Sequence, residues 1–247
     1  NMRHKIAFVE NIVLENITIR DVLRDLEVDG LYLKNCRNFI LRNIEITNLA
    51  STMTTTCGIL LWNVSDSTII NCKIHDVNVK YEFKAIYTTG DTERVTILSN
   101  QVSNITSTNS QVFGINCYGY PFKSEIHILN NQFENFYSKT AAHAVYLSHI
   151  NNTFVEGNFI RNLTSEDFIV GIRLFHSFSN KINDNDIRDV VSGTNAYGIS
   201  LQTGDNNIFL RNKIYGNWFS GSQPRSMGFF IFQTCLNNIF ALNILLN

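Results

Sequence analysis

The chain has 247 residues and carries 20 Lys and Arg against 21 Asp and Glu, a formal net charge of −1 at pH 7. This balance argues against a general nucleic-acid-binding protein and against a polybasic membrane-binding patch. With 44% hydrophobic and 17% charged residues, the chain is too apolar for a disordered polypeptide. Its 33 Asn and 29 Ile, against 8 Ala and 2 Pro, favour strands joined by tight turns over helices.

Cysteine usage and apolar runs restrict the class of protein further. The five Cys residues are widely spaced, with no CxxC pair and no Cys/His cluster, so we expect free buried thiols, no metal site and no cofactor. No run of 18 apolar residues is present, which argues against a transmembrane helix. The hydrophobic pattern is already present at Ile6 and still present at Ile244. We therefore expect residues 1–247 to form a single domain that is a segment of a longer chain.

A short strand-like motif recurs along the chain at intervals of 27 to 30 residues. Each copy is a small residue followed by an apolar residue, any residue and, in most copies, a second apolar residue. The copies start at Gly30, Gly58, Ala85, Gly114, Ala144, Gly171, Gly198 and Gly228. Such self-similarity at a fixed period is the signature of a solenoid.

Two further columns of residues follow in each repeat. About 14 residues after the small residue stands a column that is mostly Asn: Asn16, Asn43, Cys72, Asn100, Asn131, Asn158, Asn185, Asn212 and Asn243. The next column is Asp21, Asn48, Asp76, Asn104, Asn135, Asn162, Asp189 and Gly216. Asn and Asp at a fixed place in each repeat indicate bends, because their side chains hydrogen-bond the backbone of a turn. Buried Asn residues could stack into a ladder, and Cys72 should interrupt it.

The segments between the columns distinguish two solenoids of similar period. A leucine-rich repeat would have a helix in its second half, whereas residues 39–46 and 208–214 alternate apolar and polar residues, as strands do. Each repeat is therefore interpreted as three short strands and three turns. The fold class expected is an all-β, right-handed parallel β-helix of about nine coils of 27–31 residues, roughly 40 Å long at the usual strand spacing.

These columns resemble the parallel β-helix repeat superfamily, which includes pectate-lyase-like, NosD-like and tailspike-like proteins. The resemblance extends from about Ile6 to Asn247. It implies a protein that cuts, epimerises or binds acidic polysaccharides, or one that forms a structural spike. The Gly-His-Gly motif of polygalacturonase-type members and the Arg-x-Pro-x-x-Arg motif of pectate lyases are absent from the sequence.

The outward side of the first strand of each repeat is unusually aromatic for a solvent-facing surface. One outward position reads Tyr32, Leu60, Tyr87, Asn116, Tyr146, Arg173, Ser200 and Phe230. The next reads Lys34, Trp62, Thr89, Tyr118, Ser148, Phe175, Gln202 and Phe232. Aromatic rings can stack on sugar faces and Arg can pair with a uronate carboxylate, so this face is a candidate glycan groove. The alternative is that other protein segments or chains cover it.

The middle repeats hold the candidate site. In a lyase, Arg173 and Asn116 would neutralise the uronate carboxylate, and Tyr146 would be the acid. His143 or Lys84 would be the base. The remaining candidates for substrate binding are Tyr87, Tyr118 and Trp62. The alternatives are a hydrogen-bonded bend histidine at 143 and simple surface packing of Tyr146 and Arg173.

The functional hypothesis is an extracellular, cell-surface or virion-surface protein that binds or processes polysaccharide. The alternative is a purely structural spike or shaft segment of a larger assembly, with a homo-oligomer as one form of it. The sequence leaves enzymatic activity open between a lyase-like reaction, a glycoside hydrolase-like reaction and none. A hydrolase would need two facing carboxylates, and none is predicted on the outward first-strand face of the middle repeats. Polysaccharide is the expected partner, with neither nucleic acid nor membrane.

Overall fold

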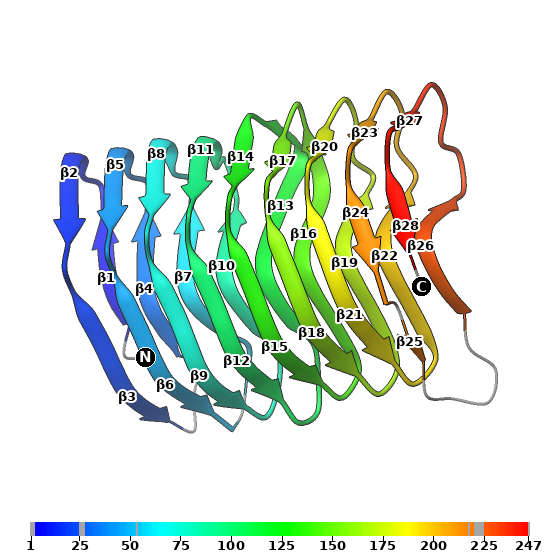
Figure 1. The fold of residues 1–247 in the computed structure, drawn as a ribbon. Helices are drawn as coiled ribbons and strands as arrows, with labels where there is room; N and C mark the ends of the chain where they lie inside the picture. Colours follow the sequence, from blue (N-terminus) through cyan, green and yellow to red (C-terminus); the bar gives the residue numbers. More distant parts are fainter. Residues whose placement is uncertain (1–2, 25–27, 53, 217, 220–224, 247) are drawn as a thin grey trace.

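The computed structural model describes residues 3–24, 28–52, 54–216, 218–219 and 225–246 of the chain. Within these residues the chain winds into a right-handed parallel β-helix whose coils stack side by side along a rod (Figure 1). Each coil contributes one strand to each of three parallel sheets, which we name A, B and C in chain order. The predicted fold class is confirmed, and the described residues contain no helix suited to crossing a membrane.

The strands of each sheet lie in the order in which the coils stack. Sheet A contains β1 (Arg3–Ala7), β4 (Asp29–Lys34), β7 (Thr56–Trp62), β10 (Phe83–Thr89), β13 (Val112–Ser124), β16 (Ala141–Asn151), β19 (Phe168–Phe175), β22 (Asn195–Gln202) and β26 (Arg225–Phe232). Sheet B contains β2 (Glu10–Glu15), β5 (Arg37–Arg42), β8 (Ser65–Ile70), β11 (Glu93–Leu98), β14 (Ile126–Leu129), β17 (Phe154–Glu156), β20 (Lys181–Asn183), β23 (Ile208–Leu210) and β27 (Ile239–Ala241). Sheet C contains β3 (Thr18–Arg24), β6 (Glu45–Ser51), β9 (Lys73–Val79), β12 (Gln101–Ser107), β15 (Gln132–Ser138), β18 (Phe159–Ser165), β21 (Asp186–Ser192), β24 (Lys213–Tyr215) and β28 (Ile244–Leu246), and β25 (Trp218–Phe219) also pairs with β21.

The interior is one continuous apolar core that runs through the stacked coils. Equivalent inward residues of successive coils lie directly over one another, because the strands pair in parallel register. On sheet C one such stack is Ile19, Ile46, Ile74, Val102, Phe133, Ile160, Ile187 and Ile214. Full burial of each such side chain contributes about 1.5–3 kcal/mol, so the stacking of the coils is held mainly by these columns.

The small residue of the sequence motif lies at an irregularity shared by the sheet A strands. In the pairing of β13 with β16, the register runs from Phe113–His143 to Ile115–Val145 and omits Gly114. A Cβ atom added to Gly114 would lie 2.5 Å from the carbonyl oxygen of Ala144 and 2.5 Å from Cδ1 of Phe133. Only Gly or Ala stands at this point in the repeat because the next coil and the core approach the backbone closely.

A ladder of buried Asn side chains satisfies the turn between sheets B and C. Asn158 is typical: its backbone N–H donates to Oδ1 of Asn185 at 3.0 Å, and its Nδ2 donates to the same oxygen and to the Ile128 carbonyl, both at 2.9 Å. Its own Oδ1 accepts from the backbone N–H of Asn131 at 2.9 Å. The full ladder is Asn100, Asn131, Asn158, Asn185, Asn212 and Asn243. The predicted ladder is thus confirmed for these members.

The first two members of the predicted Asn column are wrong. The pairing of Glu45 with Lys73 places Ile44, not Asn43, beside Cys72. Asn16 and Asn43 are exposed, with φ of 56° and 55°, and occupy the left-handed bend one residue earlier. Adjacent positions in this turn are both rich in Asn, so spacing alone did not separate the exposed bend from the buried ladder.

Cys72 ends the buried ladder and does not interrupt it. Its backbone N–H donates to Oδ1 of Asn100 at 2.8 Å, and its thiol lies 3.4 Å from the Ile70 carbonyl and 3.9 Å from the Leu41 carbonyl. The coil before it has Ile44 at the ladder position, where no amide continues the chain of hydrogen bonds. Burial raises the pKa of the Cys72 thiol to about 11, so it remains a neutral donor.

The other two turns have ladders that the sequence did not reveal. Between sheets A and B, the backbone N–H groups of Thr153, Asn180 and Asn207 each donate to the Asn side chain of the next coil. Between sheets C and A, buried Ser hydroxyls donate to turn carbonyls, as Ser107 does to Tyr81 at 2.6 Å. Side chains therefore satisfy buried backbone groups at all three corners.

We expect Asn158→Ala to lower the free energy of unfolding by about 3 kcal/mol or more, because each buried polar group left without a partner costs about 1–3 kcal/mol. The measurement is equilibrium denaturation in urea. The matched control is Asn162→Gly, at an exposed left-handed bend where Gly keeps the backbone conformation. Equal decreases in the free energy of unfolding for the two variants would show that the buried ladder contributes no more to stability than an exposed bend.

Candidate functional site

The outer face of sheet A carries three parallel ladders of side chains. The entry ladder is Asp29, Cys57, Lys84, Phe113, His143, Val170, Tyr197 and Met227. The central ladder is Tyr32, Leu60, Tyr87, Asn116, Tyr146, Arg173, Ser200 and Phe230. The exit ladder is Lys34, Trp62, Thr89, Tyr118, Ser148, Phe175, Gln202 and Phe232, with Thr89 and Tyr118 following the pair Thr88–Cys117.

Side chains of neighbouring ladders on this face pack against one another, so the face is more buried than an ordinary solvent-facing sheet. In the central ladder Tyr32 and Asn116 are only 6% and 5% exposed. The exit ladder is the exposed margin, where Trp62 and Tyr118 remain 42% and 41% exposed. All eight residues predicted for the site therefore lie on one face, but the structure divides them between a covered layer and an open edge.

Lys84 is held by a carboxylate that the sequence analysis did not place here. Its Nζ lies 2.8 Å from Oε1 of Glu82 and 4.1 Å from the ring centroid of Tyr87. Burial acts to lower the pKa of Lys84, but the ion pair with Glu82 raises it above its ordinary value. Lys84 is therefore a cation at neutral pH and not the free base that a lyase needs.

His143 is enclosed by the aromatic layer. Its side chain is 1% exposed and its ring lies 5.2–5.7 Å from those of Phe113, Tyr146 and Phe168. Burial, reinforced by the positive charge of Arg173, lowers its pKa well below the ordinary value. Nδ1 is buried and has no hydrogen-bond partner among the described residues. The imidazole is thus neutral, but a polymer on the surface does not reach it in this conformation.

Arg173 lies across the aromatic layer. Its guanidinium carbon is 5.3 Å from the Tyr146 ring centroid and 5.2 Å from that of Phe168, and Nη2 donates to Oε1 of Gln202 at 3.1 Å. Nε is buried without a hydrogen-bond partner, and none of the ion pairs of the described residues involves Arg173. Burial lowers the pKa of the guanidinium because no carboxylate compensates its charge.

Two polar side chains, Asn116 and Tyr146, lie beside Arg173 in the central ladder. Asn116 and Tyr146 pair in register, and the Tyr146 ring contacts Phe113, His143 and the Arg173 guanidinium. Tyr87, one coil earlier, presents its ring to Lys84. The face can therefore offer amide, phenol and guanidinium groups on consecutive coils to a ligand.

The sequence analysis missed the residues that cover this layer. Phe113 and Phe168 lie over His143, and Asp29 is a buried carboxylate beside Cys57. Burial, and then the charge of Asp29, raise the pKa of the Cys57 thiol, which makes it unreactive. The available signal was the residue directly before each small residue of the motif, such as Phe113 before Gly114, which belongs to the entry ladder but was not examined as a ladder.

An imidazole pair lies where the exit ladder meets the turn into sheet B. The rings of His149 and His176 stack with centroids 5.1 Å apart, and His149 meets both Tyr118 and Phe175 edge-on at 5.9 Å. Burial, and then repulsion by His176, lower the pKa of His149. The described residues contain no group of three or more His, Cys, Asp or Glu side chains that could hold a metal ion.

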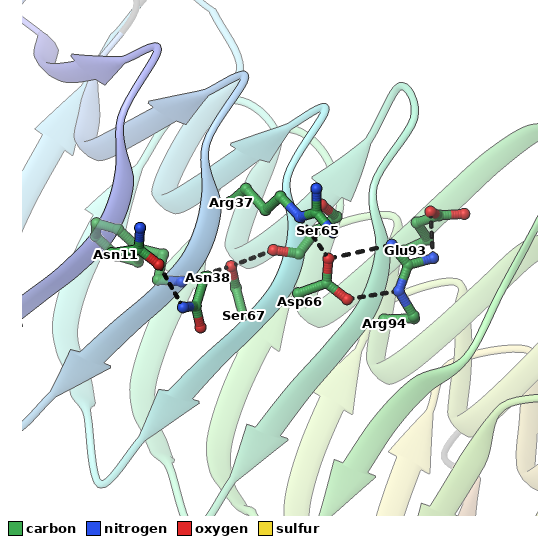
Figure 2. Close-up of polar contacts among 9 residues, drawn as sticks. Asn11, Arg37, Asn38, Ser65, Asp66, Ser67, Glu93 and Arg94 are labelled. Atoms are coloured by element: carbon green, nitrogen blue, oxygen red, sulfur yellow. Dashed lines mark hydrogen bonds and ion pairs between the residues drawn. The ribbon is translucent and has the colours of Figure 1, made fainter.

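A second polar cluster lies at the start of sheet B (Figure 2). Asp66 accepts from Nε of Arg37 at 3.0 Å and from Nε of Arg94 at 2.5 Å, and Arg94 also pairs with Glu93. Hydrogen bonds from Arg94 and then Arg37 lower the pKa of Asp66 from 3.8 to about 2. The charges of the cluster neutralise one another across three coils. The cluster therefore links these coils and offers little free charge to a ligand.

Comparisons with known proteins identify a family but no specific relative. The sequence matches the family described as "Right handed beta helix region" over residues 6–135 and 57–245. No curated protein matches significantly. Among solved structures, the chain is similar to the crystal structure of PfbA, a surface adhesin of Streptococcus pneumoniae, with 13% sequence identity and a TM-score of 0.35, over 96% of this chain and 71% of that one. A likeness at this level says nothing about ligands.

We expect the Asp66 cluster to add stability that depends on pH. Because folding lowers the pKa of Asp66 from 3.8 to about 2, the contribution is present above about pH 4 and is lost as the pH falls towards 2. Asp66→Asn keeps the left-handed bend, where φ is 52°, and should unfold more easily than the native chain at pH 6 but equally easily near pH 2. Thermal unfolding across this pH range measures the difference.

The control for this prediction is Asp189→Asn, at another left-handed bend, where φ is 53°. This substitution also removes an Asp carboxylate at a left-handed bend, but Asp189 makes no ion pair with the described residues. If both variants follow the same pH dependence, the paired arginines of Asp66 are not the cause.

Proposed function

The chain belongs to the right-handed β-helix family, and we propose that the outer face of its sheet A binds an acidic polysaccharide outside the cell or on a virion surface. The observation that carries the proposal is Arg173, a largely buried cation with no carboxylate partner among the described residues. An unpaired buried charge is costly, and an anionic ligand would offset that cost. A uronate carboxylate suits a guanidinium because it can accept two parallel hydrogen bonds.

The neighbours of Arg173 support a sugar ligand in particular. Asn116 and Tyr146 supply an amide and a phenol beside Arg173, and both groups suit the hydroxyls of a sugar. Trp62 and Tyr118 supply exposed rings, which suit its apolar face. A ladder in which each coil presents one group fits an extended polymer lying along the rod better than it fits a compact ligand.

Binding without turnover is the form of the function that the burial of His143 favours. A general base must come within hydrogen-bond distance of the proton it removes, and His143 is 1% exposed beneath Phe113, Tyr146 and Phe168. Lys84 is engaged by Glu82. The expected lyase roles of His143, Lys84 and Tyr146 stay predictions of the sequence, and a turnover assay tests them.

We expect Arg173→Ala to weaken binding of acidic polysaccharide at least tenfold, because it removes the uncompensated cation. The measurement is isothermal titration calorimetry with polygalacturonate, alginate and hyaluronan as probes, at two salt concentrations, since screening should weaken the native interaction. The matched control is Arg161→Ala on sheet C, whose guanidinium is already paired with Glu134 at 2.9 Å. Arg173→Lys should keep part of the affinity.

Two outcomes would change the conclusion. No binding of any of the three polymers by the native chain would overturn the proposal and leave the structural-shaft hypothesis. Release of unsaturated uronate from any polymer, followed by its absorbance and lost in Tyr146→Phe and His143→Gln, would replace simple binding with the lyase reaction.

A further inference from the structure

Among the arginine side chains that the structure describes, Arg173 is the one whose partner is an amide and not an acid. Its Nη2 donates to Oε1 of Gln202 at 3.1 Å. Each of the others lies 3.9 Å or less from a carboxylate oxygen, and they are Arg20, Arg37, Arg42, Arg94, Arg161, Arg188 and Arg211. Gln202 stands one coil after Arg173, as Asp66 stands one coil after Arg37, so an amide occupies the place that a carboxylate takes elsewhere.

The sheet A strands around Arg173 offer no acid that could take the place of Gln202. Neither Asp nor Glu occurs in β16, β19 or β22, and neither occurs in β7, β10, β13 or β26. The same coils do carry acids on the other two sheets, as Glu156 of β17 and Asp186 of β21 show. An anion that approaches Arg173 along sheet A therefore meets no fixed negative charge on these strands.

Gln202 gives the guanidinium a direction that the surrounding rings do not. The guanidinium carbon lies 5.3, 5.2 and 6.0 Å from the ring centroids of Tyr146, Phe168 and Phe175. These rings attract the positive charge, but only a hydrogen bond is directional enough to select one N–H group. Because a guanidinium has five N–H donors, the bond to Gln202 decides which of them remain for a ligand.

An amide can hold Arg173 without neutralising it. The amide oxygen accepts a hydrogen bond but carries no net charge, whereas a carboxylate in the same place would compensate the guanidinium. Glu has nearly the same size as Gln, so a residue that only filled space or linked coils at this position could equally be Glu. The amide is the partner that fixes the cation and keeps its charge available.

We infer that Gln202 is a positioning residue that sets the anion preference of the sheet A face. Its amide orients the Arg173 guanidinium, and its lack of charge leaves that guanidinium free to pair with the carboxylate of an acidic sugar. This inference rests on the proposed function and names the residue on which its preference for anions depends.

The test is Gln202→Glu, which keeps the size of the side chain and places a carboxylate next to Arg173. We expect affinity for polygalacturonate to fall at least about tenfold, because the ligand then competes with an internal ion pair. Thermal unfolding should shift to higher temperature, because the buried cation gains a partner. A purely structural role would move affinity and stability in the same direction. Calorimetry and thermal unfolding of the same preparations measure the two effects.

Two further variants separate charge from orientation. Gln202→Ala removes the hydrogen bond but adds no charge, so we expect weaker binding that is as sensitive to salt as in the native chain, whereas in Gln202→Glu this sensitivity should be reduced. Gln132→Glu, at an exposed position on sheet C, adds the same charge away from Arg173 and should bind as the native chain does.

Three outcomes would overturn the inference while leaving acidic-polysaccharide binding intact. They are a Gln202→Glu chain that binds no more weakly than Gln132→Glu, a Gln202→Glu chain that unfolds at a lower temperature than the native chain, and a Gln202→Ala chain with native affinity. Failure of the native chain to bind polygalacturonate, alginate or hyaluronan would overturn both this inference and the proposed function.

Discussion

Backbone hydrogen bonding between coils is the constraint on which the rest of this structure depends. Every residue of every strand must meet its equivalent in the next coil at about 4.8 Å, so the chain has to return to the same place after each circuit. A coil can vary in length only where an insertion does not disturb that register. The three corners are the difficult points, because the backbone leaves the sheets there and its polar groups would otherwise be buried unpaired. Asn, Thr and Ser side chains meet this need by hydrogen-bonding across coils, as Asn158 does to Asn185.

The same constraint explains what could be predicted from the sequence. Parallel in-register stacking repeats each environment every coil, so Gly114 and its equivalents, and the Asn residues from Asn100 onwards, were recognisable as columns. The Asn column failed where two environments with the same residue preference lie side by side: Asn43 occupies a left-handed bend and Ile44 the buried ladder position. The Ser107 hydroxyl ladder escaped notice because Ser is also common at exposed turns, and its carbonyl acceptor belongs to another coil.

The sequence predicted where the residues of the candidate site lie on the fold, but not how exposed their side chains are. Alternation along a strand assigns Tyr87, Asn116, Tyr146 and Arg173 to the outer side of sheet A, and the structure brings them together on consecutive coils. The alternation in the sequence does not reveal that Phe113 and Phe168 cover His143, because this coverage depends on the conformations of side chains that reach across coils. The alternation also does not reveal the ion pair between Lys84 and Glu82, because Glu82 lies in the turn before β10 and not on the strand. Sequence periodicity gives neighbours within a ladder, whereas contacts between ladders depend on packing.

A solenoid recognises ligands under the same geometry that stabilises it. Because each coil contributes one residue to each outer ladder, any pattern along a ladder is a pattern in distance, with a step fixed by the backbone and not by side-chain choice. A compact active site needs several groups converging on one point. Here the groups on sheet A are spread over many coils, and the His143 imidazole, whose Nδ1 has no hydrogen-bond partner among the described residues, is buried. The Arg173 guanidinium differs from these groups, because it lies near the rings of Tyr146 and Phe168 and pairs with no carboxylate among the described residues. An extended anionic polymer is the kind of ligand that both features suit, because its own repeat can match the step of the coils while its charge meets a cation fixed in the surface.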